Sequence, residues 1–231
     1  MRNALVTGAN RGLGLEFCRQ LLAAGWRVSA CCREPRRADA LVALHEGAAG
    51  RLQIEALDVA VAAQIAALAE RLASRGHLDL LINNAGVLVS GERFGTLRAE
   101  DLARSFAINA SAPLLLTQAL APLLARGHAA KVLCVTSQLG SIAQAHEFRT
   151  VSYAVSKAAL NMGVRRLAAE LGARGITVVA MHPGWVRTDM GGAAAPLQPP
   201  DAVRGMLAVL ERLTPAQGGR FYAHDGSELP W

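Results

Sequence analysis

Short apolar segments of strand length alternate along the chain with longer segments whose apolar residues recur at helical spacing. Strands of a parallel sheet are buried on both faces and need helical crossovers, so this alternation predicts an α/β fold. Right-handed crossovers then give a doubly wound parallel β-sheet, the Rossmann fold, as one domain over residues 1–231. The expected strands are 4–6, 26–32, 52–57, 78–82, 131–136, 176–181 and 220–223, and the expected helices are 12–24, 38–44, 61–73, 102–124, 152–171 and 201–213.

Composition and net charge indicate which classes of ligand or partner the protein can bind. Hydrophobic residues make up 52% of the 231, which is enough for a large core. The net charge of +6 comes mostly from scattered arginines. The densest group, Arg33, Arg36 and Arg37, has no interleaved aromatic residues, so a phosphorylated small ligand is favoured over nucleic acid.

No apolar run is expected to reach the roughly 18–20 residues of a membrane helix, and no membrane partner is expected. The chain enters a strand at residues 4–6 without the leader of a signal peptide, which predicts a cytoplasmic protein. Neither the four cysteines nor the histidines have the spacing of metal ligands, so we expect reduced core thiols and no metal. The adjacent Cys31 and Cys32 should point to opposite faces of their strand.

A glycine-rich loop follows the first strand and opens the first helix, in the sequence Thr7-Gly8-Ala9-Asn10-Arg11-Gly12-Leu13-Gly14. Glycines allow a tight turn and a close approach of backbone N–H groups to a pyrophosphate, to which the helix N-terminus adds its positive dipole end. A glycine trio alone also fits a plain strand–helix turn.

These glycines and six further motifs together resemble the short-chain dehydrogenase/reductase family. The glycine motif of that family, T-G-x-x-x-G-x-G, is matched by Thr7, Gly8, Gly12 and Gly14. The resemblance spans roughly residues 4–190. Within the family, the chain is most similar to the short C-factor-like members, in its opening T-G-A-N-R-G-L-G-L-E-F, its run S-K-A-A-L-N-M and its ending Leu229-Pro230-Trp231. The other matching motifs are Asp58-Val59, Asn83-Asn84-Ala85-Gly86, Asn109, Ser137, Tyr153-x-x-x-Lys157 and Pro183-Gly184.

Tyr153 and Lys157 are the candidate pair for proton transfer. A free tyrosine has a pKa near 10, and a nearby cation lowers the pKa by favouring the phenolate. Lys157 lies four residues on, which is one turn along the same helix face. An ordinary exposed helix pair is the alternative, but the chain has only two tyrosines and one stands where the family motif requires it. The resemblance implies that Lys157 also binds the nicotinamide ribose.

Ser137 and Asn109 complete the predicted catalytic set. Ser137 ends a strand at the ligand-binding edge of the sheet and can stabilise negative charge on a carbonyl oxygen. A turn serine is the alternative reading, and Ser141 is the competing candidate. Asn109 lies inside a long helix, where either a solvated face or a function explains a polar residue. The resemblance implies that Asn109 holds a water that links Lys157 to solvent. The interval from Ser137 to Tyr153 is long for the family and predicts a loop over the substrate.

The resemblance also implies the cofactor contacts. Asp58 and Val59 would meet the adenine, although Asp58 could instead be a helix cap, and residues 84–86 would pack on the adenosine side. Pro183 and Gly184, which could also form a structural turn, would line the nicotinamide, and Thr188 would bind its carboxamide. The expected cofactor-binding residues are Gly8, Asn10, Arg11, Gly12, Leu13, Gly14, Arg33, Asp58, Val59, Asn84, Ala85, Gly86, Tyr153, Lys157, Pro183, Gly184, Val186 and Thr188.

The residue that follows the second strand indicates whether NAD(H) or NADP(H) is preferred. NAD-selective sheets place an acidic residue there for the ribose hydroxyls, whereas this chain has Arg33. Arg33 and Arg11 are expected to grip a 2′-phosphate, with the adjacent Glu34 turned away. A purely solvated arginine group is the alternative. NADP(H) is therefore the expected cofactor, with NAD(H) second.

The sequence thus predicts an oxidoreductase that moves a hydride between NADP(H) and a small carbonyl or alcohol, with Tyr153 as general acid/base. The alternative is a nucleotide-binding regulatory or cell-signalling protein with little turnover, as C-factor-like members have been linked with signalling. The Gly-, Ala- and Pro-rich residues 189–200 predict a substrate flap. The resemblance implies a homodimer or homotetramer formed through helices 99–126 and 152–171.

Overall fold

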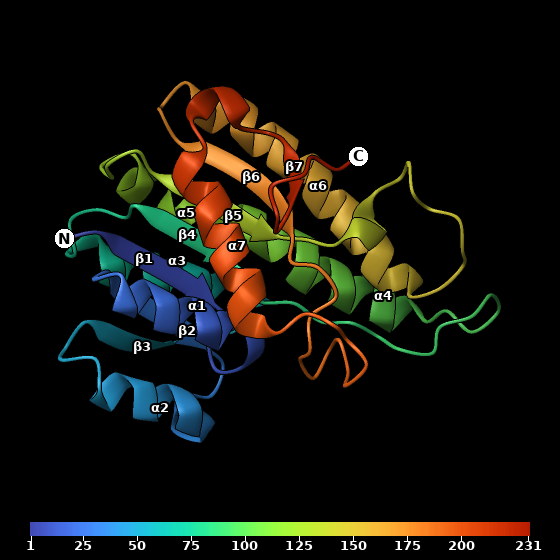
Figure 1. Ribbon diagram of the computed structural model, residues 1–231, viewed down its shortest axis with the longest axis horizontal. Helices are drawn as coiled ribbons and strands as arrows, with labels where there is room; N and C mark the ends of the chain where they lie inside the picture. The colour runs from blue at the N-terminus through green and yellow to red at the C-terminus, as the bar shows by residue number, and fades with distance from the viewer.

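A computed structural model describes residues 1–231 and has seven strands alternating with helices (Figure 1). The strands are β1 (Asn3–Thr7), β2 (Arg27–Cys32), β3 (Leu52–Ala56), β4 (Leu80–Asn83), β5 (Lys131–Val135), β6 (Thr177–His182) and β7 (Phe221–Ala223). The helices are α1 (Gly12–Ala23), α2 (Asp39–Glu46), α3 (Ala62–Ala73), α4 (Ala99–Phe106), α5 (Ala112–Leu124), α6 (Val151–Gly172) and α7 (Pro199–Arg212).

All neighbouring strands are parallel, in the order β3-β2-β1-β4-β5-β6-β7. The order reverses beside β1, so the loops after β1 and β4 meet at the topological switch point, where doubly wound sheets bind ligands. The prediction of an α/β doubly wound parallel sheet is confirmed.

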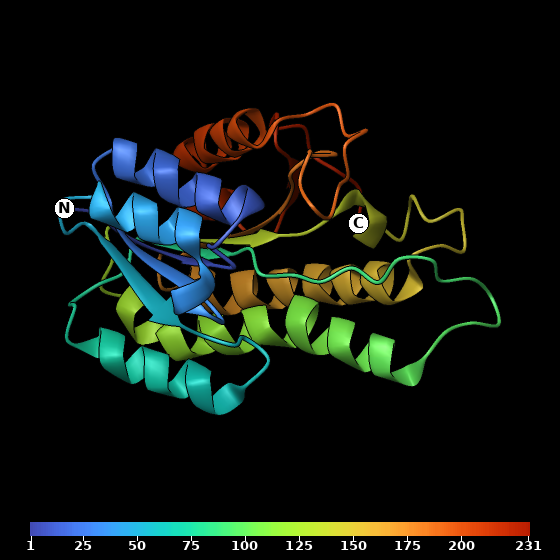
Figure 2. The same cartoon turned by 90° about the horizontal axis from the view of Figure 1, so that it is seen from below.

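Helices cover both faces of the sheet (Figure 2), and an apolar core lies on each face. Side chains of α1, α2 and α7 form the core on one face, and side chains of α3, α5 and α6 form the core on the other. Successive strand residues point to opposite faces, so Cys32 belongs to the first core and Cys31 to the second. All four cysteines are free and buried, as predicted.

The expectation that no apolar segment is long enough to cross a membrane is wrong for one helix. Ala99–Leu124 is a continuous helix of 26 residues, in which a π-helical turn at Ala107–Ser111 joins α4 to α5. By length and composition alone it could cross a membrane, contrary to the expectation that no segment would reach that length. Half of its most apolar window is buried within the fold, where Leu116 and Leu120 pack in the core on the α3, α5 and α6 side.

The C-terminal residues pack against the connection between β5 and α6. The Ser141 hydroxyl donates to the carbonyl oxygen of Pro230 at 2.7 Å, and the N–H of Ile142 donates to the carbonyl oxygen of Trp231. The Trp231 ring stacks on Phe221 of β7, with centroids 5.4 Å apart. The Ser141 hydroxyl is thus used in this contact with the C-terminal residues. This favours Ser137 over Ser141 as the site residue.

Candidate active site

The glycine loop is closed so tightly that one position excludes any side chain. A Cβ placed on Gly14 would lie 2.1 Å from the carbonyl oxygen of Gly8. Gly8 and Gly12 have φ angles of +63° and +53°, which glycine adopts without strain. The residue before α1, Arg11, makes no side-chain cap, so the first-turn N–H groups of α1 have no side-chain acceptor there. This cradle fits an anionic pyrophosphate.

The ends of β1 and β4 are joined at the same place by Thr7. Its hydroxyl oxygen accepts from the backbone N–H groups of Asn84 and Ala85, each at 3.0 Å. The Asn84 amide in turn donates to the carbonyl oxygens of Thr7 and Gly8, at 2.9 and 3.2 Å. The motif from β4 therefore holds the glycine loop in shape. In the sequence analysis Thr7 was only part of a motif, and this role was not predicted.

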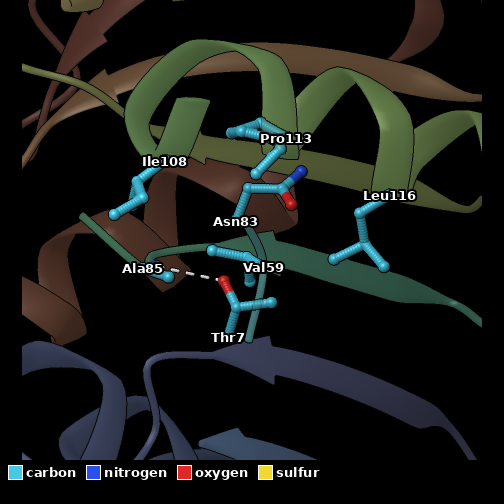
Figure 3. Close-up of a pocket in the computed structure, with 8 residues that line it drawn as sticks. Thr7, Val59, Asn83, Ala85, Ile108, Pro113 and Leu116 are labelled. Carbon is cyan, nitrogen blue, oxygen red and sulfur yellow. Dashed lines mark hydrogen bonds between the residues drawn. The ribbon is translucent and has the colours of Figure 1, made fainter. Parts of the chain in front are cut away.

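A small hollow lies beside this junction (Figure 3). Its wall includes Val59 and Ala85, both predicted to contact the adenosine part of a cofactor. Asp58 does not cap α3, whose N-cap is Val61, and its carboxylate instead accepts from the N–H of Ala60 at 3.0 Å. The lining residues are Thr7, Val59, Asn83, Ala85, Ile108, Ala112, Pro113 and Leu116. Those from the π-turn and α5 were not predicted, because nothing in their sequence distinguishes them from core positions.

Tyr153, Lys157 and Ser137 meet beyond the end of β5, and all three are buried. Tyr153 lies in the first turn of α6, and the ammonium of Lys157 is 5.6 Å from the centre of its ring. That ammonium donates to the carbonyl oxygen of Val135, the last residue of β5, at 2.7 Å. The Ser137 hydroxyl oxygen accepts from the N–H of Leu139 at 3.2 Å. The Ser137 hydroxyl also interacts with the Tyr153 side chain.

Burial is the largest cause of the pKa shifts of Tyr153 and Lys157. Loss of solvent raises the pKa of Tyr153 to about 12, and a hydrogen bond with the Ser137 side chain opposes the rise. Loss of solvent also lowers the pKa of Lys157 to about 8. Lys157 does not bring the pKa of Tyr153 below its ordinary value, which differs from the expectation from the sequence.

Two asparagines hold together the segments that carry Tyr153 and Ser137. Asn109, in the π-turn, is fully buried, so it does not lie on a solvated helix face. Its amide donates to the carbonyl oxygen of Val87 at 2.8 Å and to the Ser156 hydroxyl at 3.0 Å. Asn161 of α6 accepts from the Thr136 hydroxyl and donates to the carbonyl oxygen of Gly140, at 2.8 and 3.0 Å. These bonds fix the residues on both sides of Ser137, a role that was not predicted for Asn161.

The segment after β6 approaches the glycine loop. Gly184 has a φ of +85°, and a Cβ on Gly12 would lie 3.4 Å from the Thr188 methyl group. The Thr188 hydroxyl oxygen accepts from the N–H of Gly191 at 3.2 Å, and Val186 pairs with Leu197, so residues 186–197 fold back on themselves. Thr188 therefore faces the glycine loop.

The two arginines that were predicted to bind a 2′-phosphate, Arg11 and Arg33, differ in their surroundings. The Arg11 guanidinium forms an exposed ion pair with Asp189 at 2.7 Å. This ion pair was not predicted from the sequence. Arg33 follows β2 and is exposed, with no ion pair. The Glu34 carboxylate pairs with Arg37 at 2.9 Å. Arg33 is thus the free cation at the end of β2.

Comparisons with known proteins identify the class. The family described as short chain dehydrogenase matches residues 2–198. A 1-hydroxy-2-glutathionyl-2-methyl-3-butene dehydrogenase from Rhodococcus sp. (strain AD45) is 35% identical, with both chains covered in full. The crystal structure of an NADPH-bound carbonyl reductase from chicken fatty liver superposes with a TM-score of 0.94 at 37% identity, covering 100% of this chain and 99% of that one. The chain therefore belongs to the short-chain dehydrogenase/reductase family of oxidoreductases.

Within that family the chain is C-factor-like. It is 47% identical over 156 residues to a protein named C-signal from Myxococcus xanthus, a match that covers 68% of this chain and 94% of the relative. The resemblance stated from the sequence motifs is confirmed at both levels.

Proposed function

We propose that this protein is an NADP(H)-dependent oxidoreductase that interconverts small carbonyl and alcohol substrates, with Tyr153 as general acid/base. The observation that carries the proposal is the buried group of Tyr153, Lys157 and Ser137 at the same sheet edge as the glycine cradle. The NADPH bound to the chicken carbonyl reductase supports the choice of cofactor.

In this proposal residues 8–14 would hold the pyrophosphate, Val59 and residues 84–86 would contact the adenosine, and residues 183–188 would contact the nicotinamide. The nicotinamide, when bound, supplies or accepts the hydride. In the reaction the Ser137 hydroxyl donates its hydrogen to the carbonyl oxygen and stabilises the growing negative charge on that oxygen. Tyr153 gives its proton to the same oxygen in reduction and takes it back in oxidation.

Lys157 and Asn109 support that proton transfer. Charged Lys157 stabilises the Tyr153 phenolate that reduction leaves behind. A Cβ on Gly86 would lie 3.2 Å from Asn109 Oδ1 and 3.8 Å from Lys157 Nζ, so Gly86 keeps the space beside both groups open. Both amide hydrogens of Asn109 are already used, so a water held by Asn109 must donate to it rather than accept from it.

Carbonyl reduction should depend on the ionisation of Lys157. The pKa of Lys157 is about 8, so its ammonium is charged below that pH and is lost as the pH rises through it. We expect kcat/KM for reduction to be level near pH 7 and to fall roughly tenfold per unit above pH 8. A pH profile of NADPH oxidation measures this. The profile of Lys157→Arg should stay level to higher pH, and an unchanged break would contradict the assignment.

Arg33 should set the cofactor preference. A guanidinium binds a 2′-phosphate through charge-assisted hydrogen bonds worth about 1.5–3 kcal/mol each, which predicts NADPH over NADH by roughly 10- to 1,000-fold in kcat/KM. Arg33→Asp should weaken or reverse the preference through repulsion. Arg36→Asp is the control on the same exposed loop. Equal use of NADH by the parent protein would show that Glu34 or the backbone reads the ribose.

The overall activity is tested by NADPH oxidation against a panel of reactive dicarbonyls, quinones and aldehydes. Turnover that requires Tyr153 supports the proposal. The similarity to C-signal favours one second candidate, a nucleotide-binding signalling protein with little turnover. Micromolar NADPH binding with no turnover of any member of the panel would favour that second function.

We also propose that residues 1–231 form a single domain in which 189–200 is a substrate flap. The Arg11–Asp189 ion pair ties the flap to the glycine loop, and an exposed pair is worth only about 0–1 kcal/mol, so it can open. For assembly we propose a homodimer or homotetramer through the long helices. Exposed apolar side chains on α4, α5 and α6 support this, namely Phe106, Leu115, Val155 and Met162.

A further inference from the structure

The loop between β4 and α4 buries its acidic residue and exposes its aromatic one. Glu92 is only 5% exposed, and it is the one buried residue among positions 90–100. Phe94, two positions later, is 86% exposed. Burial of a carboxylate is costly unless the charge has a partner, so the inverted pattern calls for a specific contact of Glu92.

That contact is the first turn of α6. Glu92 Oε2 accepts from the backbone N–H of Ser152 at 3.1 Å, from 60 residues away in the chain. Residues before a helix normally provide such a cap, but here the N-cap residue Thr150 has a left-handed backbone with φ +44° and makes no side-chain cap. A negative charge at this end also complements the helix dipole. Glu92 therefore replaces the missing local cap.

The capped turn carries Tyr153. Ser152 directly precedes Tyr153, and the carbonyl oxygen of Tyr153 accepts from the Ser156 hydroxyl at 2.7 Å, which Asn109 holds from the other side. The loop that bears Glu92 starts from the cofactor motif at residues 84–86 and is pinned at Val87 by Asn109. Figure 2 shows this connection running along α6 past its N-terminal end before it turns back into α4.

Three buried oxygens at this place have no partner: Glu92 Oε1, Thr150 Oγ1 and Ser152 Oγ. Unpaired buried polar atoms are unfavourable, and structures retain them where they serve a role. A threonine or serine cap within residues 148–150 would hold the helix without burying a charge. A cap from the cofactor-side loop does more, because it ties the position of Tyr153 to that loop.

We propose that Glu92 is a positioning residue, which fixes the first turn of α6 and hence the place of Tyr153 relative to the cofactor motif after β4. The inference rests on the proposed role of Tyr153. It concerns the placement of Tyr153 and assigns Glu92 no contact with substrate or cofactor.

The matched pair of variants is Glu92→Gln and Glu92→Met. The two side chains have nearly equal volume, but only glutamine keeps an oxygen that accepts from the Ser152 N–H. The control is Glu147→Gln, an exposed glutamate before α6 that pairs with Arg149 at 2.9 Å. Each protein is compared with the parent by hydrogen exchange of the amides of residues 151–154, by NADPH affinity, and by kcat and KM for a carbonyl substrate.

Glu92→Met should exchange these amides at least about tenfold faster, because the turn loses a charged acceptor. Its kcat should fall about 10- to 100-fold while its NADPH Kd stays within about twofold, since Tyr153 is misplaced and the cofactor cradle is intact. Glu92→Gln should recover most of both losses, and Glu147→Gln should match the parent.

Parent-like exchange in Glu92→Met, or glutamine no better than methionine in either readout, would overturn the proposal. Faster exchange with unchanged kcat would make Glu92 a purely structural cap and would also overturn it. If the parent reduces no carbonyl, the proposed function fails first. The exchange readout with NADPH bound then decides alone, and the proposal stands only if Glu92→Met loosens residues 151–154 and glutamine restores them.

Discussion

Replacing Tyr153 with phenylalanine is expected to reduce turnover by roughly 100- to 10,000-fold, the usual effect of losing a general acid. The phenylalanine ring fills the same buried space, so packing in the first turn of α6 should be kept. The substitution removes only the hydroxyl that is proposed to deliver the proton. Burial raises the pKa of Tyr153 to about 12, so the hydroxyl is protonated at neutral pH and is ready to act as an acid in carbonyl reduction.

The chain provides its own control for this variant. Tyr222 in β7 is the only other tyrosine and is also buried, at 6% exposure. Tyr222→Phe should keep kcat within about threefold of the parent, and both variants should bind NADPH with parent-like affinity by calorimetry. If Tyr153→Phe also turned over within about threefold of the parent, Tyr153 would not be the acid.

Gly14→Ala is expected to weaken NADPH binding by up to about 150-fold. The added methyl group would lie 2.1 Å from the carbonyl oxygen of Gly8 and 2.7 Å from the Asn84 amide, so the loop must open. Overpacking of this kind costs about 1–3 kcal/mol, and the upper figure corresponds to more than a hundredfold in affinity. The Thr7 and Asn84 bonds that shape the cradle would be strained by the same movement.

Calorimetric titration of NADPH into the folded variant measures this effect. Gly172→Ala is the matched control, because Gly172 ends α6 with open space where its Cβ would be. It should bind NADPH as the parent does. Unchanged affinity of Gly14→Ala would mean that the pyrophosphate does not lie on this loop.

The period of the apolar residues was enough to predict the fold. Each expected strand and helix is present, with ends that differ by a few residues, because strand burial on both faces gives a strong pattern. Cys31 and Cys32 lie on opposite faces for the same reason. The apolar length of the helix Ala99–Leu124 was underestimated, because Asn109 and Thr117 interrupt its apolar run without adding charge.

The site was predictable where a residue type follows a strand end in a fixed motif, as with Ser137 after β5 and Tyr153 in α6. Contacts between distant loops left no such signal. Arg11 and Asp189 are 178 positions apart, and nothing in either local sequence indicates their ion pair. Glu92 stands in a loop without period, so its burial could be seen only in the folded chain.

The packing of the C-terminal residues has a consequence for biosynthesis. Ser141 and Pro230 are 89 positions apart, so the ribosome must add those residues before their contact can form, a delay of several seconds at about 5–20 residues per second. The strands β1 to β4, which carry the glycine loop and its partner Asn84, can assemble on the nascent chain during that time. The connection between β5 and α6 is anchored last, so a chain that stops before β7 would have the glycine loop but would lack the C-terminal anchor of this connection.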